Sequence, residues 1–113
     1  MADMYAAADL YADVLDALTA ARAFMLSTQF QAALTDATRP AAGETLYNVQ
    51  EAILDLSNAS LANIADNMEA NEISLRQQTD GLNAVIKTFN NVQSVIDGIT
   101  RIIGTVGKIL PLL

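Results

Sequence analysis

The sequence contains no cysteine and no histidine, and each absence removes a type of chemistry. Without cysteine the chain forms no disulfide and offers no thiolate to a metal ion. Without histidine it lacks the side chain that most often serves as general base, proton shuttle or transition-metal ligand. We therefore expect no catalytic residues, no metal site and no bound cofactor.

The remaining polar residues do not change this expectation. Glu69 and Glu72 are one helical turn apart, but without histidine such a pair is typical of a solvated helix face. No glycine-rich phosphate loop is present, and no base lies near the serines to activate them. We expect a protein that is not an enzyme and has no small-molecule substrate.

Basic residues are few and unevenly distributed. Six Lys and Arg stand against thirteen Asp and Glu, for a net charge of −7. Residues 1–75 carry −9 and residues 76–113 carry +2. An acidic body repels phosphates, and no basic stripe offsets it, so we expect no nucleic-acid partner.

The chain also lacks obvious targeting segments. Its first residues carry aspartates where a cleavable signal would need lysine or arginine, and they contain no unbroken apolar run. No stretch reaches the roughly 18–20 apolar residues of a spanning helix. We expect a cytoplasmic protein or one exported by a signal-independent route.

Proline and aromatic residues are scarce. The two prolines, Pro40 and Pro111, are separated by 70 residues, while 52% of all residues are hydrophobic and 5% are aromatic. Proline-free length and abundant alanine favour helix over sheet. We predict one all-α domain over residues 1–113.

The first segment, about residues 3–37, has the period of an amphipathic helix, with Asp3 as a plausible N-cap. Its apolar stripe comprises Met4, Ala7, Tyr11, Val14, Leu18, Ala21, Met25 and Ala32. Pro40 and Gly43 then predict a turn over 38–44, although residue 38 or 39 could equally cap a second helix with Pro40 in its first turn. In both cases the chain bends here into a helical hairpin.

A second helix is expected over about residues 45–110, because an apolar heptad repeat continues to the end of the chain. The repeat defines a predicted interaction seam: Leu61, Ile64, Met68, Leu75, Leu82, Val85, Phe89, Val92, Ile96, Ile99, Ile103, Val106 and Leu110. Asn71 and Gln78 interrupt it. Buried amides at such positions fix register and partner number, although this stretch could instead face solvent. The repeat is typical of a coiled coil or a long bundle.

Residues 79–81 are the one candidate break within this second helix. A break near Gly81 would give a three-helix bundle. The repeat stays in phase across Gly81, however, and glycine costs a helix only about 1 kcal/mol, which favours a continuous helix. Such a helix would be about 100 Å long. The first helix could not cover it, so the seam would need partners.

The segment 95–113 is strongly amphipathic, with its aliphatic residues within an arc of about 140°. Three roles are open to it: a buried bundle helix, a subunit contact, or a helix lying on a membrane surface.

These features lead to three functional expectations. The first is a non-enzymatic module that self-assembles or binds a helical protein through the seam. The second is a protein that associates with membranes through residues 95–113. The third is an exported helical subunit of a filament or secretion system, or an adaptor, suggested by layout alone.

Overall fold

The computed structural model describes residues 4–110, and this part of the chain is all-α, as the sequence predicts. Its six helices are α1 (Met4–Met25), α2 (Thr28–Ala33), α3 (Arg39–Asn58), α4 (Leu61–Ala70), α5 (Glu72–Lys87) and α6 (Val92–Ile109). The proposed N-cap Asp3 lies outside the described residues.

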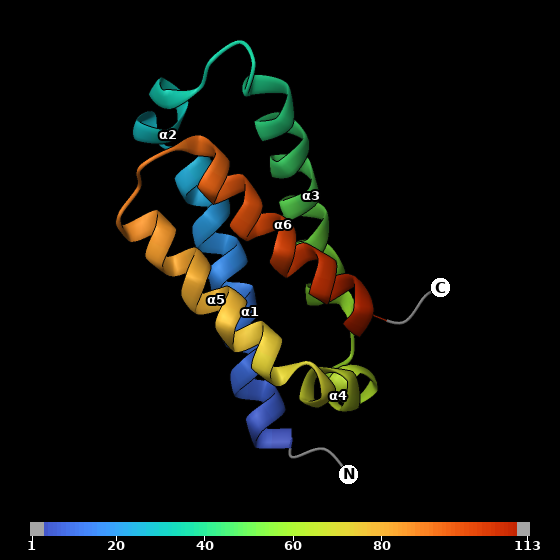
Figure 1. Cartoon of the computed structure of the whole chain (residues 1–113). Coiled ribbons are helices and arrows are strands. Elements are labelled where there is room, and N and C mark those ends of the chain that lie inside the picture. Colours follow the sequence, from blue (N-terminus) through green and yellow to red (C-terminus); the bar gives the residue numbers. More distant parts are fainter. Residues whose placement is uncertain (1–3, 111–113) are drawn as a thin grey trace.

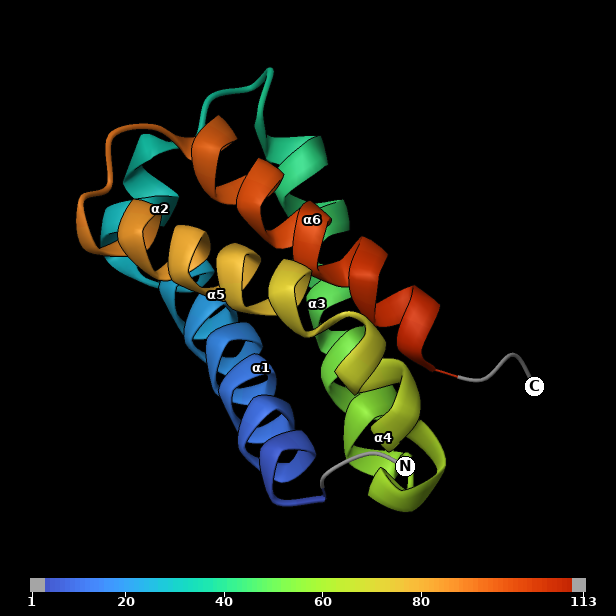
Figure 2. The ribbon, with the colours of Figure 1, turned by 60° about the horizontal axis from the view of Figure 1, so that its bottom comes forward.

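Four helices form the body of the bundle. α1 contacts α3 and α5, and α6 contacts the same two helices, so α1 and α6 lie on opposite corners. α1 and α5 run in one direction while α3 and α6 run in the other (Figure 1). The short helices α2 and α4 lie at opposite ends of the bundle (Figure 2). Because α3 and α5 occupy opposite corners, α4 joins them across the end.

The first helix is shorter than expected. α1 ends at Met25, and Ser27 caps α2 by accepting a hydrogen bond from the Phe30 amide at 3.2 Å. Ala32 is therefore exposed rather than part of the buried stripe. The predicted turn over 38–44 is also wrong. α3 begins at Arg39 with Pro40 in its first turn, so the alternative in which residue 38 caps a second helix is the correct one.

The single helix over 45–110 is wrong as well. That part of the chain forms most of α3 and all of α4, α5 and α6, with breaks at 59–60, at Asn71 and at 88–91. Gly81 lies within α5 with a negative φ, so the alternative break over 79–81 is not present.

The heptad pattern hides the reversal between α5 and α6. The connection over 88–91 has four residues, close to one helical turn of 3.6, so the apolar phase continues across it. The signal that was missed is Asn91, whose side chain accepts a hydrogen bond from the Ser94 amide at 2.8 Å. Asparagine is among the preferred N-cap residues.

The core is closed by α6, whose buried side chains meet those of the other long helices. At one end, the rings of Phe24, Phe30 and Phe89 pack with centroids 5.1 to 6.0 Å apart. At the other, the Asn67 side chain donates to the Ile109 carbonyl at 3.0 Å, which joins α4 to the end of α6. Aromatic and polar contacts thus hold both ends of the last helix.

α5 and α6 approach closely at Gly98 of α6. A Cβ atom built on Gly98 would lie 3.3 Å from Leu82 Cδ1 and 3.7 Å from the Leu82 Cα. A Cβ atom on Gly81 would have no atom within 4 Å among the described residues. Only the first glycine is required for packing.

We expect opposite effects from two matched substitutions. Gly81→Leu should raise the free energy of unfolding by about 0.5–1 kcal/mol, because leucine is the better helix former and the site is open. Gly98→Leu should lower it by about 1–3 kcal/mol, because the side chain overpacks the α5–α6 contact. Chemical denaturation followed by circular dichroism measures both. Destabilisation by Gly81→Leu would contradict a continuous α5.

Candidate interaction surface

The predicted seam lies inside the bundle. Leu61, Val85, Phe89, Ile103 and Leu110 are partly buried against the core, and the other eight members are buried: Ile64, Met68, Leu75, Leu82, Val92, Ile96, Ile99 and Val106. The chain folds back on itself at 88–91, so the seam is covered by its own helices. The expectation of an uncovered apolar ridge is therefore wrong.

The two polar members of the seam do not pair with each other. Asn71 lies between α4 and α5, where its side chain donates to the Asn67 carbonyl at 2.8 Å. Gln78 lies within α5, and its Oε1 is buried without a hydrogen-bond partner in the described structure. The Thr79 hydroxyl, also on α5, is likewise buried without a hydrogen-bond partner among the described residues. α5 thus carries an unfavourable desolvation cost.

Of the amphipathic segment predicted over 95–113, residues 95–109 lie in α6, whose apolar arc faces the core, and residues 111–113 lie outside the described part of the chain. Asp97, Arg101 and Lys108 lie on its exposed side. Arg101 and Lys108 are seven residues apart, so they share one edge of that side. Across residues 4–110, no helix combines the length and apolar character needed to span a bilayer.

Asp9, Asp13 and Asp16 lie on one exposed side of α1. Asp13 Oδ2 lies 3.8 Å from Arg76 Nη1 on α5, and Arg76 Nε lies 2.8 Å from Glu72. The hydrogen bond to Glu72 is the main cause that raises the pKa of Arg76 above its ordinary value. No group of carboxylates in the described part of the chain is arranged to hold a metal ion.

Among the residues whose burial the structure describes, 6–110, large apolar side chains remain exposed at four positions, two of them on one face of α3. Tyr47 is 61% exposed and Leu54 is 56% exposed. Seven residues separate them, which places them about 20° apart around the helix and about 10.5 Å apart along it. Leu26 and Ile73 are exposed as single residues elsewhere. Of these four exposed side chains, only Tyr47 and Leu54 lie on the same helix face.

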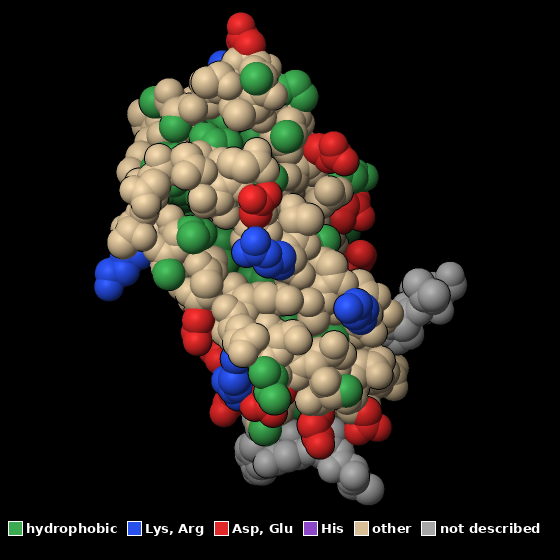
Figure 3. Space-filling view, viewed as in Figure 1, with side chains coloured by type: hydrophobic (Ala, Val, Ile, Leu, Met, Phe, Trp, Pro, Cys, Tyr) green, Lys and Arg blue, Asp and Glu red, His purple; other side chains and the backbone are tan. Residues whose placement is uncertain are grey.

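An acidic edge runs beside this pair. Glu44, Glu51 and Asp55 are exposed and lie about 40–80° to one side of Tyr47. Figure 3 shows acidic side chains along the side of the molecule formed by α3, and on the face formed by α6 it shows Lys and Arg with one acidic side chain beside them. We call Glu44, Tyr47, Glu51, Leu54 and Asp55 the α3 outer face.

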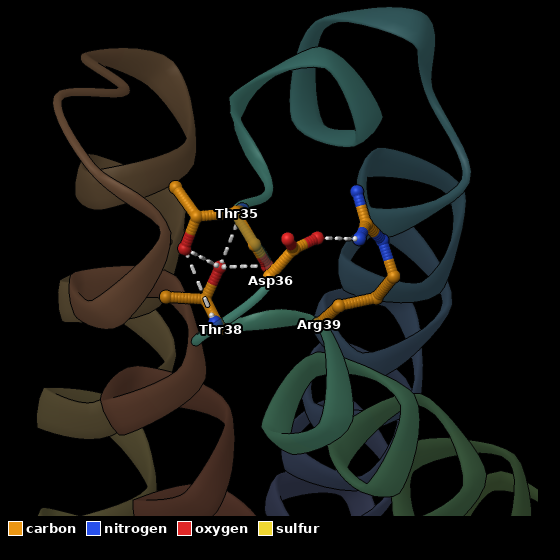
Figure 4. Close-up of polar contacts among 4 residues, drawn as sticks. All are labelled: Thr35, Asp36, Thr38 and Arg39. Carbon is orange, nitrogen blue, oxygen red and sulfur yellow. Dashed lines mark hydrogen bonds and ion pairs between the residues drawn. The ribbon is translucent and has the colours of Figure 1, made fainter.

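The start of α3 leaves this acidic edge without a cation. Before the helix, the Thr35 amide donates to Thr38 Oγ1 at 2.8 Å and the Thr38 amide donates to Thr35 Oγ1 at 3.2 Å (Figure 4). Arg39 then pairs with Asp36 at 2.8 Å. Around the axis of α3, Arg39 lies about 140° from Glu44. The basic group nearest in sequence is therefore directed elsewhere.

Tyr47 and Glu51 interact on the α3 outer face. The Tyr47 hydroxyl and the Glu51 carboxylate are hydrogen-bonded, and this bond is the main cause that raises the pKa of Tyr47 above 10.0. Ionisation of the phenol would cost the hydrogen bond and place two negative charges together.

In comparisons with known proteins, no protein-family model, curated protein or solved structure matches the chain.

We expect Glu51→Gln to lower the pKa of Tyr47. Glutamine removes the negative charge that opposes phenolate formation. Ultraviolet titration of wild type and variant, each compared with its own Tyr47→Phe derivative, isolates this tyrosine. Glu69→Gln on α4 is the matched control and should leave the titration unchanged. An unchanged Tyr47 curve in Glu51→Gln would contradict the contact.

Proposed function

We propose that the protein is a non-enzymatic helical interaction module whose contact surface is the α3 outer face. Its supporting observation is the exposed pair Tyr47 and Leu54 beside an acidic edge. Burial of such side chains is favourable by about 25 cal/mol for each Å² of apolar area. Tyrosine is enriched at protein interfaces, where its ring packs and its hydroxyl remains hydrogen-bonded. The seam stabilises the module from within.

This proposal differs from binding through the seam. The seam residues are already buried in the bundle, so their exposure to a partner would require the core to open. The α3 outer face is accessible in the closed bundle. A helical protein or a second copy can therefore bind it without unfolding cost.

A photo-reactive residue on α3 tests the proposal. Placed at the exposed Gln50, which is one turn from both Tyr47 and Leu54, it should give adducts in purified protein or in a lysate of the source organism. Leu54→Glu should reduce the yield several-fold, because it places a charge at the apolar centre. The matched control is the exposed Gln77 on α5, where adducts should be few.

The adduct mass identifies the partner class. Adducts of about twice the chain's 12.0 kDa indicate a second copy, and other masses indicate a different protein. Equal yields at both positions, or yields unaffected by Leu54→Glu, would reject the α3 outer face as the contact surface.

A second candidate function is association with a membrane surface through α6. It is favoured by the width of the apolar arc on α6 together with the unpartnered Gln78 and Thr79 oxygens on the adjacent α5. Opening of the bundle would hydrate these two atoms and regain part of their desolvation cost. The released α6 would then lie in the interface with Arg101 and Lys108 towards anionic headgroups.

A disulfide between α5 and α6 tests this second candidate. The Cβ built on Gly98 lies 3.8 Å from Leu82 Cβ, which is a typical disulfide separation. The chain has no other cysteine to compete. With anionic vesicles, reduced Leu82→Cys/Gly98→Cys should float and the oxidised protein should not. Equal flotation of both forms would show that membrane binding does not need release of α6.

A further inference from the structure

The outer face of α6 has the features that would complement the α3 outer face. Arg101 and Lys108 form one edge and are seven residues apart, the same spacing as Glu44 and Glu51. Beside this edge lie Thr100, Gly104 and Gly107, all exposed. A Cβ on either of these two glycines would have no described atom within 4 Å. Because these glycines have no side chains, the α6 surface beside Arg101 and Lys108 is shallow.

The hand of the helix decides how the two faces can meet. Viewed from outside with its N-terminus down, α3 carries its acids to the right of Tyr47 and Leu54. In the same view, α6 carries its cations to the right of its small residues. Two such faces bring their right-hand edges together only when the helices run antiparallel. Parallel packing would place the acids of α3 over the glycines.

One antiparallel register satisfies both the charges and the shapes. When Arg101 lies opposite the space between Glu51 and Asp55, Lys108 falls beside Glu44 because both separations are seven residues. The bulky side chains then face small ones, with Tyr47 near Gly107 and Leu54 near Thr100. Asp97, the acid on this side of α6, falls opposite Ser57 and is as close along the axis to Asp55 as Arg101 is, so the favourable pairs are Arg101 with Glu51 and Lys108 with Glu44.

We propose that the α3 outer face docks antiparallel on the outer face of α6 in a second copy of this chain. The inference rests on the proposed function and names its partner. Antiparallel packing of two α3 outer faces would bring their acidic edges together, and parallel packing would leave both acidic edges without a cation. Each copy offers one acidic and one cationic face at different places, so the contact is head-to-tail and leads to open chains or rings.

The contact is small and partly electrostatic, so its affinity is weak. Two apolar side chains and two ion pairs place the dissociation constant at about 0.1–1 mM. Added salt should weaken it, because exposed charges are screened. Sedimentation velocity of the full chain up to about 1 mM should show species larger than a dimer at low salt.

Charge reversal on each face gives the decisive test. An acid-reversed variant carries Glu44→Lys and Glu51→Lys, and a base-reversed variant carries Arg101→Glu and Lys108→Glu. Each variant alone should bind itself at least about tenfold more weakly than wild type. In a one-to-one mixture, the reversed faces are complementary, and association should return to the wild-type level.

Controls separate this result from effects of net charge and of folding. Asp9→Lys with Asp16→Lys on α1 changes the net charge as the acid-reversed variant does, and should leave association unchanged. Circular dichroism melting should be similar for the three charge variants and wild type, since every charge-reversed position is exposed. The oxidised Leu82→Cys/Gly98→Cys protein should associate as its reduced form does, because docking does not require release of α6.

The outcomes distinguish failure of this inference from failure of the proposed function. A wild type that stays monomeric at low salt, a mixture that does not associate, or loss of association on oxidation overturns docking on α6. Photo-adducts at Gln50 with a different protein would still support the α3 outer face as a contact surface. Absence of any Leu54-dependent adduct overturns that function itself.

Discussion

Burial of the apolar arc of α6 is the interaction on which the rest of the structure depends. α1 and α3–α5 leave an open side, and α6 closes it against α3 and α5. The close approach of Gly98 to Leu82 allows this helix to sit deep, and the Asn67 hydrogen bond to the Ile109 carbonyl fixes its end. The closure also determines which surfaces remain available to a partner. The apolar residues that could otherwise drive association are buried in the core of the bundle.

Sequence periodicity predicted helices and their buried faces better than it predicted where helices end. Val14, Leu18, Leu75, Leu82 and Ile99 were all placed on apolar stripes, and all are buried. The pattern did not reveal chain reversal, because a connection of about one turn preserves helical phase. Local capping chemistry was the better signal for boundaries. Ser27 and Asn91 each cap a helix through a side chain, and both residue types are preferred there.

The candidate surface was missed for a related reason. Heptad analysis ranks residues by apolar repetition, and the strongest repetition belongs to the core of the folded chain. Tyr47 and Leu54 form a repeat of only two members, within a helix whose stronger stripe is buried. Their exposure depends on which face of α3 the other helices occupy, and that follows from tertiary packing. From the sequence, the acidic edge could be recognised only as part of the general excess of negative charge. The structure shows that Glu44, Glu51 and Asp55 lie on one side of α3.

The order of the helices along the chain also has a consequence for synthesis. α6, which completes the core, is synthesised after α1–α5, so these helices exist for a time with their apolar sides facing water. The connection through α4 across the end of the bundle is made during that interval. A nascent chain stalled before Val92 would therefore expose apolar surface to chaperones and to other incomplete chains. In the folded protein this surface is buried. Cellular quality control would therefore act most strongly on this protein before α6 is synthesised.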